Sequence, residues 1–136
     1  MKQVRYFEDL EVWQAARIFA KRIFEITDSE KFKWEHRLTE QMHASSGSIM
    51  DNIAEGYERN GNKEFINFLY YSKGSCGEIR SQLTRCFDVG LISEDDYKNL
   101  RQQAVEISVA IYNLINSIYD SGFKGVKYYR QNENQH

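Results

Sequence analysis

The chain has 136 residues, of which 41% are hydrophobic and 28% charged, and its net charge is -2. This length fits one domain with its own core, and the slightly acidic balance excludes a global field that attracts nucleic acid. No stretch approaches the roughly 18 apolar residues of a membrane span, and the N-terminus lacks the apolar run of a signal peptide, so we expect a cytoplasmic protein that contacts no membrane.

The first predicted helix covers about residues 10–27. The chain contains no proline, which favours long uninterrupted helices. Within this segment apolar residues alternate spacings of four and three, the pattern of a helix with one buried face. Those residues are Val12, Ala16, Phe19, Ile23 and Ile26. Asp9 is the expected N-cap of this helix.

The second predicted helix covers about residues 34–59 and contains the run ASSGS at residues 44–48. Small residues in a row indicate that another backbone packs close to them, and Gly74 and Gly77 of the third helix are the expected partners. The sequence Asn60-Gly61-Asn62 follows, with Gly61 as a C-terminal stop and Asn62 as the N-cap of the third helix.

The third and fourth predicted helices cover about residues 63–89 and 94–119. Gly90 ends the third, and Ser93 with Asp96 resembles a capping box at the start of the fourth. Cys76 and Cys86 both lie in the third helix, about 15 Å apart, which is too far for a disulfide. We expect two buried free thiols in a reducing compartment.

Four such helices with short connections predict an all-α protein, an antiparallel up-down-up-down four-helix bundle. We expect one domain over residues 1–136, with a flexible tail from about residue 122. The fourth helix carries a second apolar stripe beside its core-facing residues: Val105, Tyr112, Ile115 and Tyr119. Together with Ile18 on the first helix, this stripe favours an interface between copies of the chain, while a broad core stripe is the alternative.

A polar stripe on the second helix is the main candidate site. It consists of Ser48, Asn52, Glu55 and Arg59. Glu78 and Gln82 of the third helix are placed to face it. We interpret these residues as a polar network that fixes how the two helices meet. A solvated surface is one alternative. An enzyme, hydrolase-like or metal-dependent, with Glu55 and Glu78 as acid and base is another, although no nucleophile accompanies them.

The sequence favours no metal or cofactor site. Glu40 and His43 have the Glu-x-x-His spacing of di-iron carboxylate bundles, but such centres need two of these motifs and the chain has one. No glycine-rich phosphate loop and no CxxC motif occur. We therefore expect no enzyme activity, no metal and no cofactor.

The C-terminal segment GFKGVKYYRQNENQH is the candidate nucleic-acid site. Cations alternate there with aromatic rings, the combination that binds single strands. The candidate residues are Lys124, Lys127, Tyr128, Tyr129 and Arg130. In an assembly of several chains these weak patches would repeat, and avidity would raise their affinity.

Four sequence blocks resemble a known family, the four-helix-bundle proteins encoded in intervening sequences of bacterial 23S ribosomal RNA genes. The blocks occur in family order and lie between Tyr6 and Tyr97: YFEDLEVWQAA, SIMDNIAEGYERNGNKEF, the continuation INFLYYSKGSCGEI, and GLISEDDY. The resemblance implies a closed bundle, ring-like homopentamers and no established enzymatic activity. It also implies RNA, DNA or another protein as partners, since one accessory protein of diversity-generating retroelements in this family binds nucleic acid and a reverse transcriptase.

The chain departs from the family pattern at three points. Met50 stands where the family usually has proline, and His43 and Ala44 stand where arginines often precede the small-residue run. The chain is also slightly acidic, whereas the nucleic-acid-binding relatives are basic. We therefore expect a non-enzymatic scaffold or binding module that assembles with itself, and nucleic acid is the further candidate partner.

Overall fold

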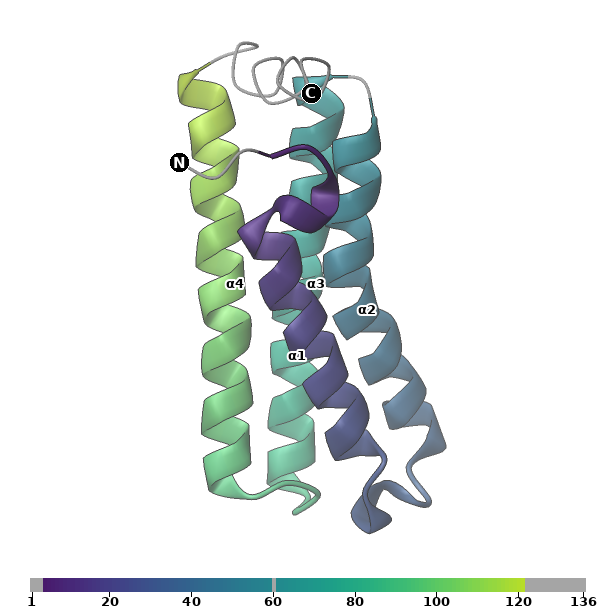
Figure 1. Ribbon diagram of the computed structural model, residues 1–136. Coiled ribbons are helices and arrows are strands. Elements are labelled where there is room, and N and C mark those ends of the chain that lie inside the picture. The colour runs from purple at the N-terminus through teal and green to yellow at the C-terminus, as the bar shows by residue number, and fades with distance from the viewer. Residues whose placement is uncertain (1–3, 60, 122–136) are drawn as a thin grey trace.

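The computed structural model describes residues 4–59 and 61–121, and these residues form helices and no strands. Two short 3-10 helices and four α-helices follow one another along the chain (Figure 1). They are η1 (Phe7–Asp9), α1 (Glu11–Thr27), η2 (Glu30–Phe32), α2 (His36–Glu58), α3 (Asn62–Asp88) and α4 (Glu94–Asp120). The all-α class is confirmed.

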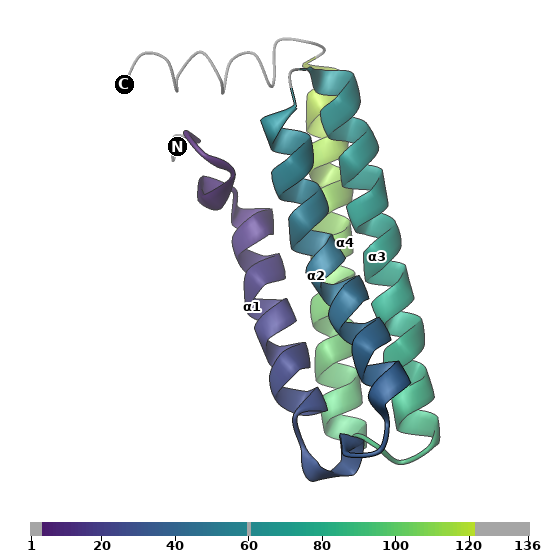
Figure 2. The same cartoon turned by 90° about the vertical axis from the view of Figure 1, so that its right-hand side faces the viewer.

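The four α-helices run antiparallel in chain order, and each packs against the next (Figures 1 and 2). α2 packs most closely on α3, and α3 on α4, whereas α1 and α4 close the bundle through a looser contact. α1 has 17 residues and α4 has 27, so the last turns of α4 extend past the start of α1. The bundle is therefore tight on the α3 side and open between α1 and α4.

All four helices contribute to one core through the faces that the four-three spacing defines. The largest fully buried side chains are Phe19, Ile23, Met42, Ile49, Ile53, Phe65, Leu69, Ile79, Leu83, Leu100, Ile111 and Ile115. Burying each such side chain contributes roughly 1.5–3 kcal/mol relative to exposure, so this core supplies most of the free energy that opposes unfolding.

The structure corrects one helix start and confirms another. The Asp9 carboxylate accepts hydrogen bonds from the main-chain N–H groups of Arg5 and Tyr6, at 2.9 and 3.0 Å, so it closes η1. Leu10 is the N-cap of α1, and the prediction of Asp9 in that role was wrong. Ser93 is the N-cap of α4 as predicted, because its hydroxyl accepts a hydrogen bond from the Asp96 N–H.

Two glycines shape the connections at the ends of α3. Gly61 precedes the helix with a φ of 154°, a conformation that side chains rarely adopt. Asn62 is the buried first residue of α3, so its prediction as the N-cap was wrong. At the other end Gly90 has a φ of 79°, and the Gly90 and Leu91 N–H groups donate to the carbonyls of Phe87 and Cys86. These two bonds form a Schellman motif, which ends the helix.

The close approach of α2 to α3 lies at Gly56. A methyl group built there would lie 2.6 Å from the Cβ of Phe68 and 3.2 Å from the ring of Phe65. By contrast, Gly74 and Gly77 are exposed and have no neighbour within 4 Å of such a methyl group. The prediction that these two glycines pack against ASSGS was therefore wrong, because they lie on the outer face of α3.

Both cysteines are free and buried in α3, as predicted. Burial raises the pKa of the Cys76 thiol from 9.0 to about 12 and that of Cys86 to about 11. Since the folded-state pKa values exceed the ordinary value, both thiols stabilise the folded chain below pH 9. This contribution is lost as the pH rises toward 11 to 12.

Replacing Gly56 by alanine is expected to lower the free energy of unfolding by about 1–3 kcal/mol, because the new methyl group overlaps Phe68. Gly47→Ala is the matched control, since Gly47 also lies within α2 and has nothing within 4 Å. That control should raise the free energy of unfolding by up to about 1 kcal/mol through helix propensity. Urea unfolding followed by circular dichroism measures both changes, and equal effects would contradict this packing.

Candidate functional site

Polar side chains join α2 to α3 at several places along their contact. The hydroxyl of Ser48 accepts hydrogen bonds from the Asn52 amide at 2.8 Å and from the Ser75 hydroxyl at 3.1 Å. Farther along, the Ser45 hydroxyl donates to the Gln82 side-chain oxygen at 2.6 Å, and both residues are buried. Polar contacts of this kind have few alternative partners in a core, so they can fix the register of the two helices.

The structure brings together three of the six predicted network residues with partners that the sequence analysis did not assign. Asn52 donates directly to Ser48 within α2, whereas the contacts across to the facing helix join Ser48 to Ser75 and Gln82 to Ser45. The four-three spacing of the core-facing residues places Ser45 at a core position of α2. That spacing could have identified Ser45 from the sequence. Whether this contact serves a function beyond packing stays a prediction.

Glu55 and Arg59 form a separate ion pair at the end of α2. Their charged atoms are 2.9 Å apart, and both side chains are about half exposed. The Arg59 guanidinium also lies 5.2 Å from the centre of the Phe68 ring. A pair this exposed contributes little to stability, so these residues form a surface feature of the α2–α3 turn.

Glu78 lies farther along the α2–α3 contact than Glu55, at the level of Ser45 and Ser48. It is exposed and lines a shallow polar groove together with Gln41, Ser48 and Arg85. Ser48 and Glu55 are seven positions apart, which corresponds to about 10 Å along α2. The structure therefore does not bring Glu55 and Glu78 together as an acid–base pair.

His43 lies between α1 and α2. Its Nε2 atom is 2.7 Å from the Thr27 hydroxyl, and its ring stacks on Phe24 at 5.2 Å. Within residues 4–59 and 61–121, no group of three His, Cys, Asp or Glu side chains is arranged to hold a metal ion. His43 of the Glu40-x-x-His43 motif therefore takes part in the contact between α1 and α2.

Exposed and half-buried apolar residues, together with glycines, occur on the outer side of α3 and α4, and we refer to this set of residues as the α3–α4 face. It consists of Tyr70, Gly74, Gly77, Val105, Val109, Tyr112 and Tyr119. On each helix these residues recur at spacings of three, four or seven, so they form two parallel stripes. The Lys73 ammonium of α3 lies 6.0 Å from the Tyr112 ring of α4, which places the two stripes side by side.

The α3–α4 face includes three of the four predicted interface residues. Tyr112 and Tyr119 are exposed and Val105 is half-buried, whereas Ile115 is fully buried within its own chain. Ile115 therefore belongs to the core, because its position on the helix turns it toward α3. We did not predict Val109, Tyr70 and the two glycines as members of this face. Their recurrence on the outward-facing stripes was not recognised in the sequence.

The predicted nucleic-acid residues Lys124, Lys127, Tyr128, Tyr129 and Arg130 lie outside the described residues. Among the helices that the structure describes, none is long and apolar enough to cross a membrane.

Comparison with known proteins agrees with the resemblance in the sequence. The family model described as 23S rRNA-intervening sequence protein matches residues 8–113. A crystal structure of a protein with unknown function from the S23 ribosomal protein family of Bacteroides thetaiotaomicron aligns with a TM-score of 0.70 at 22% identity. The alignment covers 76% of this chain and 97% of that chain, so the two share their fold. No curated protein matches.

The Ser45–Gln82 contact is testable by a double-mutant cycle. Ser45→Ala and Gln82→Ala should show a coupling free energy of about 0.5–1.5 kcal/mol in urea unfolding, because the two side chains share a buried hydrogen bond. Ser45→Ala with Glu78→Ala is the control pair, since Glu78 lines the same groove but no hydrogen bond joins it to Ser45. If the changes in unfolding free energy are additive in both pairs, the Ser45–Gln82 hydrogen bond does not determine the register of α2 and α3.

Proposed function

Because the chain belongs to the 23S rRNA-intervening sequence protein family, we propose that it is a non-enzymatic binding module that assembles with copies of itself through the α3–α4 face. The observation that carries this proposal is the combination of exposed aromatic side chains with exposed helical glycines on that face. Five copies in a ring is the assembly that the family resemblance implies.

The glycines support a helix-packing role for this face. A glycine inside an exposed helix costs about 1 kcal/mol relative to alanine, and among the described residues none lies close enough to require that Gly74 or Gly77 lack a side chain. Their cost is offset if a helix of a neighbouring copy packs directly on their backbone. Tyr112 and Tyr119 beside them supply large apolar area with few rotatable bonds, which suits the centre of an interface.

Nucleic acid is the second partner that we propose, and the C-terminal cations and tyrosines support it. Each chain contributes Lys124, Lys127 and Arg130, which are close in sequence to the aromatic residues Tyr128 and Tyr129. The net charge of -2 argues against strong binding by one chain. An assembly repeats the segment, so several weak contacts act together.

Replacing Val109 by lysine should reduce the assembly to smaller species, because Val109 is 52% exposed at the middle of the proposed interface and a charge there would be desolvated. Val89→Lys is the matched control, since Val89 is 71% exposed at the end of α3, away from that face. Light scattering on a sizing column measures the mass in solution. A wild-type mass of 16.1 kDa would exclude self-assembly and leave the face for another protein.

RNA binding should weaken as salt increases, because neutralised phosphates release counterions. Replacing Lys124, Lys127 and Arg130 by glutamine should lower the slope of log affinity against log salt by about two for single-stranded RNA, given 0.7 per phosphate contact. Fluorescence anisotropy at several salt concentrations measures the slope. An unchanged slope in the triple variant would place any RNA contact elsewhere on the protein.

A further inference from the structure

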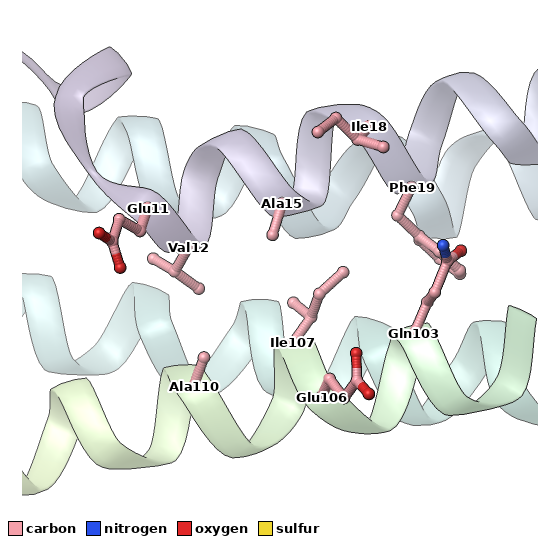
Figure 3. A pocket seen from close by; sticks show the side chains of 9 residues that line it. All are labelled: Glu11, Val12, Ala15, Ile18, Phe19, Gln103, Glu106, Ile107 and Ala110. Atoms are coloured by element: carbon pink, nitrogen blue, oxygen red, sulfur yellow. The ribbon is translucent and has the colours of Figure 1, made fainter.

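A groove of about 370 Å³ lies between α1 and α4, where the bundle closes loosely (Figure 3). Figure 3 shows Ala15 of α1 and Ile107 of α4 pointing toward one another across it. Ile18 of α1 also lines the groove and is 62% exposed. An apolar groove with polar edges is typical of a surface that another molecule covers.

The edges of the α1–α4 groove are acidic. Glu11 lies on the α1 side and Glu106 on the α4 side, and both are exposed (Figure 3). Glu106 accepts a hydrogen bond from Gln102 at 3.3 Å, and neither carboxylate forms an ion pair with any described residue. A surface that fits this groove therefore combines an apolar or aromatic side chain with a cation on either side of it.

The side of the bundle that carries the α3–α4 face has this chemistry. The Lys73 ammonium lies 6.0 Å from the centre of the Tyr112 ring, and Arg80 follows Lys73 by seven positions, about 10 Å along the same side of α3. Both cations are half-buried, and neither forms an ion pair with any described residue. Glu78 and Glu106, the carboxylates in the middle turns of α3 and α4, line grooves on other sides of the bundle. The middle of the α3–α4 side is therefore cationic.

The first cation and the first carboxylate lie at nearly the same height along the bundle. The hydrogen bond of 2.7 Å from Arg22 to Asn99 fixes the height of α1 relative to the antiparallel α4. Glu11 lies eleven positions before Arg22, so it is level with the part of α4 eleven positions after Asn99. That part of α4 is less than one turn from Tyr112, whose ring lies beside Lys73. Glu11 and Lys73 are thus level with one another on two sides of the bundle.

The second cation and the second carboxylate match in the same way. Because α3 and α4 are antiparallel and Arg80 follows Lys73 by seven positions, Arg80 is level with the part of α4 seven positions before Tyr112. This part lies within about one turn of Glu106. Two copies that stand side by side in the same orientation, as in a ring, therefore bring each cation to the height of a carboxylate.

The two surfaces also meet at an angle that suits a closed assembly. α4 packs on α3 at one side and on α1 at the other, so the α3–α4 face and the α1–α4 groove lie on adjacent sides of the bundle, roughly at a right angle. A contact between two different surfaces is heterologous, and it closes into a ring when each copy is rotated relative to the last. Adjacent sides impose such a rotation at every contact.

We propose that the α1–α4 groove binds the α3–α4 face of a second copy of this chain. Tyr112 of one copy enters the groove of the next. Lys73 then lies opposite Glu11, and Arg80 lies opposite Glu106. Charge complementarity selects a second copy as the occupant, because the cations of one surface match the carboxylates of the other in number and height. This inference rests on the proposed self-assembly and names the surface that receives the α3–α4 face.

Charge reversal tests the pairing. Lys73→Glu with Arg80→Glu, and separately Glu11→Lys with Glu106→Lys, should each weaken assembly about tenfold or more, because like charges then face one another. A variant with all four substitutions should recover the wild-type mass, since every contact again pairs opposite charges. Arg85→Glu is the matched control, because Arg85 is an exposed cation of α3 that lines the polar α2–α3 groove instead. Light scattering over a dilution series measures the assembly, and circular dichroism checks that each variant is folded.

The outcomes separate this inference from the proposed self-assembly. If the α3–α4 variant dissociates while the groove variant keeps the wild-type mass, the face binds another surface, so the groove inference is wrong and self-assembly stands. Two dissociated double variants whose combination stays dissociated would also overturn the pairing, as would two that both keep the wild-type mass. A wild-type mass of 16.1 kDa would contradict both proposals.

Disulfide crosslinking is a second readout that leaves the charges unchanged. Gly77 on the α3–α4 face and Ala15 in the groove are both exposed, and each lies four positions after Lys73 or Glu11. Co-expressed Gly77→Cys and Ala15→Cys chains should form a crosslinked dimer in roughly tenfold higher yield than either variant alone, because the contact is heterologous. Gly77→Cys with Ala44→Cys is the control pair, since Ala44 is exposed on α2, and the native thiols are buried. Equal yields in the two pairs would show that the groove does not receive this face.

Discussion

The contact between α2 and α3 determines how the rest of the bundle is arranged. Gly56 brings α2 within van der Waals limits of Phe68, and the hydroxyl of Ser72 donates to the Ile49 carbonyl of α2 at 2.7 Å. Small residues thus replace the bulky side chains that normally separate two helices. Gly61, whose φ of 154° is rare for residues with a side chain, allows a short connection between α2 and α3. Since α1 packs on α2 and α4 on α3, this central pair fixes the places of both outer helices.

α4 contacts its surroundings differently on its two sides. One side joins α3 and presents the apolar α3–α4 face, whereas the other meets α1 only loosely and borders the groove.

The sequence predicted the helices well because their apolar residues follow one consistent spacing, as the positions of Phe19, Ile53 and Leu83 show. It predicted the candidate site less well. Glu55 lies on the same stripe as Ser48, but it extends to solvent and pairs with Arg59. Gly74 and Gly77 differ from Gly56 only in which way they face, and a small error in helical phase decides between a close contact and open space. Spacing along one helix cannot supply that phase, since it depends on how the neighbouring helices are rotated.

Cys76 and Cys86 lie on α3, the helix at the centre of both tight contacts, and burial keeps their thiols protonated. Cys86 lies 3.5 Å from the sulfur of Met42 on α2, so its sulfur becomes accessible only when α3 moves away from α2. Thiolates react with alkylating reagents, whereas buried thiols do not. The rate at which an alkylating reagent labels these two sulfurs would therefore report how often the closed bundle opens. The two cysteines thus provide a kinetic measure of how often α3 separates from α2. This is the contact on which the arrangement of the bundle depends.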